Sequence, residues 1–226
     1  MAPFCPNLSN KKVREKFEEL TDIFGEDIAY FLWGKNGGYP LDYAPNGAPS
    51  ILFKSLMDHY SDRKQALISK AKVYSSNFKD WFGDWTKEDK TDVSKIVDED
   101  GEPLVVYRGD SVDKETFEAK PSSLNVTGIY FAGITQMVQT YVEPSFYNDY
   151  KEGEMYSVFI NAKNPFIGTR MDVDDWNDGK LNEYDAWIYG NFPKGNGELV
   201  VRTSEQIKSI DNNGEFSKEG NIYHNI

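Results

Sequence analysis

The first third of the chain repeats apolar residues with the period of an α-helix. Residues 9–24 place apolar side chains on one face, which predicts an amphipathic helix. Ser9 or Asn10 can cap this helix, and Gly25 ends it. The same periodicity predicts one long helix over residues 50–74. Residues 27–33 are a short apolar piece, and residues 34–50, rich in Gly, Pro and Asn, are expected to be a loop.

A stripe of large aromatic residues follows the second helix. Its members recur at helical spacing and are Phe78, Trp81, Phe82 and Trp85. Such a stripe is typical of core packing. We therefore expect these rings to join a helical N-terminal region, residues 1–75, to the module that follows, residues 76–226.

Beyond the aromatic stripe the apolar period shortens to two, which is the period of a strand. The turn-forming run Glu99-Asp100-Gly101-Glu102 separates strands expected at 95–98 and 103–108, which predicts a hairpin. Further strands are expected at residues 128–132, 155–162, 198–202 and 206–210. Short helices and long loops between the strands indicate an α+β fold with two small packed sheets.

Composition and charge restrict the class of function. The 226 residues are 39% hydrophobic and 15% aromatic, which is enough for a packed core. Residues 1–75 hold 10 Lys+Arg against 9 Asp+Glu, whereas residues 76–226 hold 15 against 28. An acidic module repels phosphate backbones, so a nucleic-acid partner is disfavoured.

The same composition bears on metal sites and location. The single cysteine, Cys5, rules out a disulfide framework, and two histidines without a Cys or His cluster predict no metal site. No apolar run approaches the ~18 residues of a membrane span. Residues 1–10 lack the basic-then-apolar layout of a signal peptide. The expected location is the cytoplasm, with no membrane partner.

Two tyrosines draw attention to the middle of the chain. Tyr130 lies in the apolar run GIYFA, and Tyr141 ends the segment GITQMVQTY that follows. Two tyrosines on a strand–helix unit can form an apolar slot with polar tips, which suits a flat heteroaromatic ring. Most units of this kind are simply core, so both interpretations stay open at this point.

Four motifs in order give the chain a resemblance. The run LVVYRG at residues 104–109 precedes GIYFA and Tyr141, and GELVV at residues 197–201 precedes the terminal QIKS. This order resembles the ADP-ribosyltransferase superfamily, in particular the catalytic domains of the poly(ADP-ribose) polymerase and diphtheria-toxin-like enzymes. From about Phe78 onward the chain is also similar to the ADP-ribosyltransferase modules of polyvalent proteins from phages and mobile elements.

The resemblance implies a split-sheet fold with NAD held in the cleft. NAD⁺ would be the substrate, cleaved with release of nicotinamide and transfer of a single ADP-ribose to a macromolecule, expected to be a protein. Expression from a phage would place it in the host cytoplasm. Two alternatives use the same pocket: an NAD glycohydrolase, and a catalytically inactive module that binds NAD or ADP-ribose. RNA 2′-phosphotransfer on a related fold is disfavoured by the acidic charge.

The resemblance also assigns roles to individual residues. Glu198 would be the catalytic carboxylate that stabilises the oxocarbenium ion. Gly109 would pair its backbone with the nicotinamide carboxamide, with Tyr107 of the same strand also at the cofactor. Tyr130 and Tyr141 would sandwich the nicotinamide ring, and Tyr141 is counted with the catalytic residues.

Arg108 departs from the pattern of the tyrosine-clamped relatives, which have His at this position. An arginine offers a bidentate fork suited to pyrophosphate, as in the arginine-first, cholera-toxin-like branch of the superfamily. We therefore count Arg108 among both the catalytic and the cofactor-binding residues. The alternative is a structural salt bridge to a neighbouring acid. Trp187 and Tyr189 lie where relatives place a target-recognition loop, with ordinary packing as their alternative.

Overall fold

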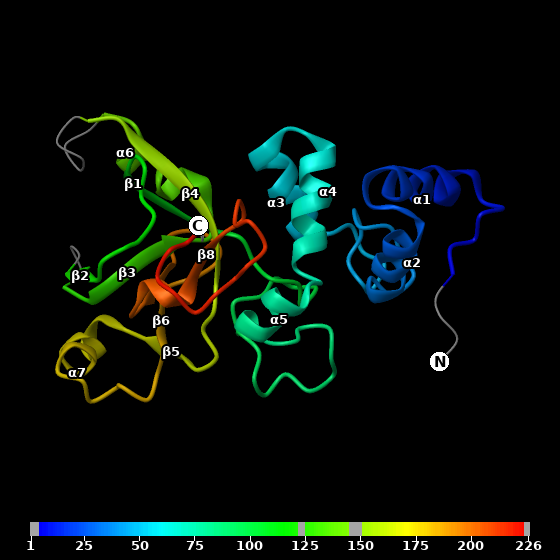
Figure 1. Cartoon of the computed structure of the whole chain (residues 1–226). Helices are drawn as coiled ribbons and strands as arrows, with labels where there is room; N and C mark the ends of the chain where they lie inside the picture. The colour runs from blue at the N-terminus through cyan, green and yellow to red at the C-terminus, as the bar shows by residue number, and fades with distance from the viewer. Residues whose placement is uncertain (1–4, 122–124, 145–150, 224–226) are drawn as a thin grey trace.

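A computed structural model describes residues 5–121, 125–144 and 151–223 (Figure 1). Its first helix, α1 (Lys11–Phe24), is the predicted amphipathic helix. The side chain of Asn10 accepts hydrogen bonds from the backbone N–H groups of Lys12 and Val13, so Asn10 is the cap. The helix ends at Gly25, whose φ of 82° is a conformation that other residues rarely adopt. Helix α2 (Glu26–Lys35) follows directly.

The prediction of one helix over residues 50–74 is wrong. Two helices occupy this stretch, α3 (Ile51–Tyr60) and α4 (Arg63–Lys72). Ser61 between them is left-handed, with a φ of 52°, and the side chain of Asp62 caps α4. A Ser-Asp pair favours capping over continued helix, because its short polar side chains compete for backbone groups.

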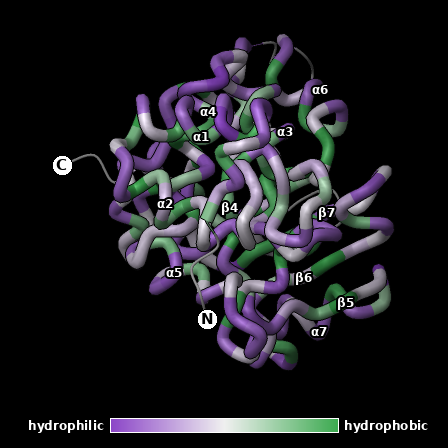
Figure 2. The backbone as a smooth tube through the Cα atoms, turned by 90° about the vertical axis from the view of Figure 1, so that its right-hand side faces the viewer, coloured by the Kyte–Doolittle hydropathy of each residue, from purple (hydrophilic) through white to green (hydrophobic). Residues whose placement is uncertain are grey.

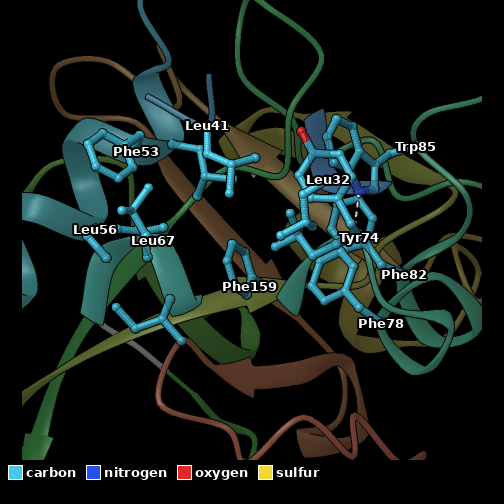
Figure 3. Packing of buried hydrophobic residues seen from close by; sticks show 14 of the residues in the cluster. Leu32, Leu41, Phe53, Leu56, Leu67, Tyr74, Phe78, Phe82, Trp85 and Phe159 are labelled. Carbon is cyan, nitrogen blue, oxygen red and sulfur yellow. Dashed lines mark hydrogen bonds between the residues drawn. The ribbon is translucent and has the colours of Figure 1, made fainter. Parts of the chain in front are cut away.

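The aromatic stripe forms the predicted core contact between the helices and the sheet. Helix α5 (Ser76–Phe82) buries Phe78, Trp81 and Phe82, and Phe78 packs edge-on against Phe159 of the sheet. Leu32, Leu56 and Leu67 of the preceding helices belong to the same cluster (Figure 3). The core therefore continues across residue 75, and the boundary between residues 1–75 and 76–226 stays a prediction.

Eight strands follow and form a mixed sheet. They are β1 (Val106–Ser111), β2 (Lys120–Pro121), β3 (Thr127–Ala132), β4 (Gly153–Ile160), β5 (Pro165–Gly168), β6 (Ala186–Tyr189), β7 (Glu198–Val201) and β8 (Ile207–Ser209). The order is β5-β6-β7-β3-β1-β4-β8, with β2 paired to β3. Only the β5–β6 pair is parallel. This architecture confirms the predicted α+β class, but the described strands form one sheet where two small packed sheets were expected.

Short helices connect the strands. They are the 3₁₀ turns η1 (Thr135–Met137), η3 (Arg170–Asp172) and η4 (Ser204–Gln206) and the helices α6 (Gln139–Val142) and α7 (Val173–Asn177). Apolar stretches of the chain coincide with β6 and β7, whereas the outer loops are largely hydrophilic (Figure 2). No helix among the described residues is long and apolar enough to cross a membrane.

The predicted strands are confirmed where apolar and polar residues alternate because one face of the strand is buried. The four strands expected after residue 125 are β3, β4, β7 and β8, with end shifts of one or two residues. The hairpin around Gly101 is reduced to one isolated bridge between Val97 and Pro103. Strands β2, β5 and β6 were not predicted.

A seam of one residue pair divides the sheet. Strands β1 and β3 pair only at Tyr107 and Ala132. Beyond this point β1 continues along β4 as far as Ser111, while β3 continues along β7. Figure 1 shows β1 with β4 and α6 on one side of the opening and β3 with β2 on the other. This divergence produces the split-sheet architecture that the resemblance implied.

Candidate active site

A cleft of about 850 Å³ opens where β1 and β3 diverge. Its walls come from β1, β3, α6 and the start of β4 and β7. Five of the six residues predicted for the site line this cleft: Arg108, Gly109, Tyr130, Tyr141 and Glu198. They come from four different elements, so the fold brings together residues that the sequence separates by up to 90 positions.

Tyr107 is the predicted residue that the cleft does not include. Side chains alternate across a strand, so Tyr107 faces away from its neighbour Arg108. It packs against the core shared with the helices, and its phenol lies beside Ser55 and Asp58 of α3. Burial raises the pKa of this phenol. The geometry therefore gives Tyr107 a packing position.

Glu198 occupies the root of the cleft. It opens β7 and pairs in register with Ala132, the β3 residue at the seam. Its Oε2 atom is buried and has no hydrogen-bond partner among the described residues. Burial removes water from the carboxylate and raises its pKa. Native proteins rarely leave a buried carboxylate oxygen unpartnered, so this group requires an explanation beyond stability.

Gly109 allows helix α6 to lie directly on β1. A Cβ atom at this position would lie 2.7 Å from Cβ of Tyr141 and 2.7 Å from the carbonyl oxygen of Val138. Both contacts are too short, so only glycine fits. The close approach places Tyr141, with 41% of its surface exposed, beside the backbone of Gly109 at the wall of the cleft.

Tyr130 lies on the opposite wall, on β3. Its hydroxyl donates a 2.6 Å hydrogen bond to the carbonyl oxygen of Val126, which holds the ring in place. The ring is half-buried and separates the cleft from a small apolar cavity behind β3 and β7. Tyr130 and Tyr141 therefore line the same cleft from opposite walls, which is the arrangement expected of a slot for a flat ring.

The contacts of Arg108 match the alternative in which it forms a structural salt bridge to a neighbouring acid. Its Nε and Nη2 atoms donate to Oδ2 of Asp110 at 3.0 and 2.6 Å, and Nη1 donates to the carbonyl oxygen of Tyr130 at 3.1 Å. Phe117 packs under the guanidinium, 5.1 Å away. Burial alone would raise the pKa of Asp110, but the charge and hydrogen bonds of Arg108 outweigh it and lower that pKa. Arg108 thus links β1 to β3 beyond the seam.

Comparison with known proteins finds a family match over the part of the chain that carries most of these cleft residues. Residues 98–181 match the family described as ADP-ribosyltransferase in polyvalent proteins. This segment belongs to the ADP-ribosyltransferase superfamily. The match spans β1, β3, α6 and β4, which carry Arg108, Gly109, Tyr130 and Tyr141. Neither a curated protein nor a solved structure matches the chain.

Glu198 lies outside the matched range, so the fold connects it to the ADP-ribosyltransferase segment. Strand β7 pairs with β3 along its whole length, from Ala132–Glu198 to Ile129–Val201. The terminal QIKS is a structural part of this arrangement. Gln206 donates to the carbonyl oxygens of Asn161 and Asp185, and the buried Lys208 donates to two carbonyl oxygens of the C-terminal segment.

Trp187 and Tyr189 lie on strand β6. Trp187 is buried and packs against Trp176 of α7, so packing accounts for it. Tyr189 pairs with Glu198 in register and borders the small apolar cavity. The connection that follows is mostly exposed over residues 190–196, and Gly197, directly before Glu198, is buried.

The sequence analysis missed four charged residues of the cleft: Asp110, Lys120, Lys151 and Glu152. Asp110 shares the face of β1 with Arg108, and the strand period of two could have revealed it. Lys120 and Lys151 reach the cleft from β2 and from the residues before β4. No local pattern marks these lysines, because the pairing of distant strands brings them to the opening.

Proposed function

We propose that this domain cleaves NAD⁺ at the bond between nicotinamide and ribose and transfers one ADP-ribose to a macromolecular acceptor. The observation that supports it best is the unpartnered carboxylate oxygen of Glu198 at the root of the cleft. A half-buried carboxylate whose inner oxygen has no cation beside it is poised to stabilise a positive charge that arises only during a reaction.

The cleft suits NAD⁺ in size and lining. A volume of about 850 Å³ lies within the range of small-molecule sites. Nicotinamide would lie between the two lips, with Tyr130 on one side and Tyr141 on the other. The backbone of Gly109 would receive its carboxamide, because β1 pairs with β4 on one edge and turns its other edge to the cleft.

The chemistry needs little proton transfer. The C1′–N bond breaks, its electron pair stays on the nicotinamide nitrogen, and nicotinamide leaves as a neutral molecule. The positive charge moves to the ribose as an oxocarbenium ion, which ionised Glu198 stabilises. The acceptor nucleophile then bonds to C1′ and releases a proton. Since burial raises the pKa of Glu198, activity should fall as the pH decreases towards that raised value.

The acceptor is proposed to be a protein, modified once. The net charge of residues 76–226 disfavours an approaching nucleic acid. The mostly exposed connection at residues 190–196 lies just before Glu198 and is available to contact an acceptor. With water as the acceptor, the same cleft would act as an NAD glycohydrolase.

Replacing Glu198 with Gln tests the proposal. The full-length protein is incubated with NAD⁺ and candidate targets, free nicotinamide is measured, and intact masses are taken. Glu198→Gln should lower nicotinamide release by ~10²-fold or more while NAD⁺ affinity stays within a few-fold. The exposed Glu205, replaced by Gln, is the matched control. Wild-type turnover in Glu198→Gln would contradict the catalytic role, and nicotinamide release without any mass gain would identify a glycohydrolase.

A further inference from the structure

The charge of the protein poses a problem for the proposed substrate. NAD⁺ carries a pyrophosphate, and the chain has a net charge of −12 that falls mainly on residues 76–226. A pyrophosphate therefore needs local cations in the cleft to offset the repulsion. Among the described residues that line the cleft, the cations are Arg108, Lys120 and Lys151.

Arg108 is poorly placed to supply this charge. Two of its nitrogens hold one carboxylate oxygen of Asp110, and a third nitrogen holds the carbonyl oxygen of Tyr130. The pair with Asp110 is neutral as a unit, with about a fifth of each side chain exposed. A phosphate drawn to Arg108 would also meet the charge of Asp110, which lines the same cleft.

Lys120 and Lys151 are exposed and, among the described residues, are not held by several hydrogen bonds as Arg108 is, although Glu152 beside Lys151 also lines the cleft. The ammonium group of Lys120 lies 3.6 Å from Glu118, in a pair whose side chains are 70% and 79% exposed. Exposed pairs of this kind are weak and exchange readily with solvent. Lys151 is exposed as well and precedes β4. A long lysine side chain can turn its charge toward an anion without strain.

The strand register sets the depth of both lysines in the cleft. Lys120 pairs with Gly128, four residues along β3 from the seam residue Ala132. Lys151 precedes Gly153, whose partner Ser111 is four residues along β1 from the seam. Four strand residues span about 13 Å. The two lysines thus stand on opposite lips, toward the outer end of the cleft and away from Glu198.

We propose that Lys120 and Lys151 form the pyrophosphate subsite of the cleft, one from each lip, while Arg108 holds the two lips together. This inference rests on the proposed function, since it assigns the part of NAD⁺ that Glu198 does not touch. The lysines bind the diphosphate of the ligand, and the nicotinamide end lies at the seam.

Ligand titration of the full-length protein tests the subsite. Wild type, Lys120→Gln, Lys151→Gln, the double variant, Arg108→Lys and Glu198→Gln are titrated calorimetrically with ADP-ribose at two salt concentrations. Lys54→Gln, an exposed lysine on α3, is the matched control. Each cleft lysine should contribute about fivefold in affinity, and the double variant about 25-fold if the two contributions add. The double variant should also lose most of the salt dependence.

The possible outcomes separate the two proposals. Wild-type affinity in the double lysine variant overturns the subsite. A large loss of affinity in folded Arg108→Lys, with the double lysine variant unchanged, would assign the pyrophosphate to Arg108 and leave the proposed function intact. No binding of ADP-ribose or NAD⁺ by wild type would overturn both. Unchanged ADP-ribose affinity in Glu198→Gln, together with the lysine losses, supports the subsite and places it apart from the catalytic carboxylate.

Discussion

Two glutamates show how differently one chain treats a buried carboxylate. Glu102 is 0% exposed and forms an ion pair with the equally buried Lys70, whose Nζ is 3.0 Å from Oε1. Ser50 donates a 2.6 Å bond to the other oxygen of Glu102. Glu198, at the root of the cleft, has neither a cation nor a hydrogen bond for its buried oxygen among the described residues.

The difference separates a structural carboxylate, Glu102, from the carboxylate that we propose to be catalytic, Glu198. The donors around Glu102 stabilise the folded state. Lys70 also donates hydrogen bonds to the hydroxyl of Ser50 and to the carbonyl oxygen of Tyr43. Burial lowers the pKa of Lys70, and the charge of Glu102 opposes that shift. At Glu198 the folded state gains nothing from the negative charge. A carboxylate kept in this way is useful only when a ligand brings the positive charge.

Breaking the buried pair should have the largest effect. Glu102→Gln leaves the ammonium of Lys70 buried without its counter-ion, so we expect a loss of about 3–5 kcal/mol in the free energy of unfolding. Denaturant unfolding followed by far-UV circular dichroism measures it. The control is Glu99→Gln, which breaks the exposed pair with Lys194 and should change stability by less than about 1 kcal/mol. Equal small losses in both variants would show that Glu102 is not structurally important.

The corresponding change at Glu198 should act in the opposite direction. Glu198→Gln removes an unfavourably buried charge, so the protein should melt higher at neutral pH, by roughly 2–4 °C for each kcal/mol gained. The folded-state pKa is raised, so wild type loses stability as the pH rises from the ordinary value of 4.5 through the raised value. The increase in melting temperature of Glu198→Gln should therefore be complete at pH values above the raised pKa, and it should vanish at pH values below the ordinary pKa.

Calorimetric melting curves between pH 4 and 8 test this sign, with Glu205→Gln as the exposed control. A variant that melts lower than wild type at pH 7, or a difference that does not change with pH, would mean that the charge of Glu198 already has a stabilising partner.

The smallest effect concerns the tyrosine slot. Tyr141→Ala should weaken NAD⁺ binding by about 1 kcal/mol, or about fivefold in Kd, because one aromatic face is lost. ADP-ribose has no nicotinamide and should lose little. Tyr39→Ala is the control, because Tyr39 is also 41% exposed but lies in the N-terminal region. Equal losses for both ligands would assign Tyr141 to packing against Gly109 rather than to the nicotinamide.

Local periodicity and motif order predicted several helices and strands and most of the candidate site residues. Glu198, Gly109 and the two tyrosines were predicted from the order of the motifs that resembles the ADP-ribosyltransferase superfamily. The cap of α1 and the aromatic stripe follow from spacing alone. The break between α3 and α4 was missed because the helical period continues through Ser61 and only the capping preference of Asp62 opposes it.

What could not be predicted depends on tertiary structure. The partner of Arg108 is set by the way β1 leaves β3 after one pair, and Lys120 enters the cleft only because β2 pairs with β3. Strands β5 and β6 are short and lack alternation: β6 buries the successive residues Ala186 and Trp187, whereas β5 is an edge strand that exposes Ile167. The pair of Lys70 and Glu102 joins residues from separate elements, so no periodicity in the chain indicates it.

The buried pair also bears on how such a domain can be moved between proteins. Recombination favours cuts where few contacts cross. Here the sequence changes character near residue 75, but the cation of the pair lies before that point and its carboxylate lies after it. A gene fragment that carried the cleft alone would inherit Glu102 without Lys70. We therefore expect the helices before residue 75 and the sheet to fold as one unit, even though none of helices α1 to α5 lines the cleft.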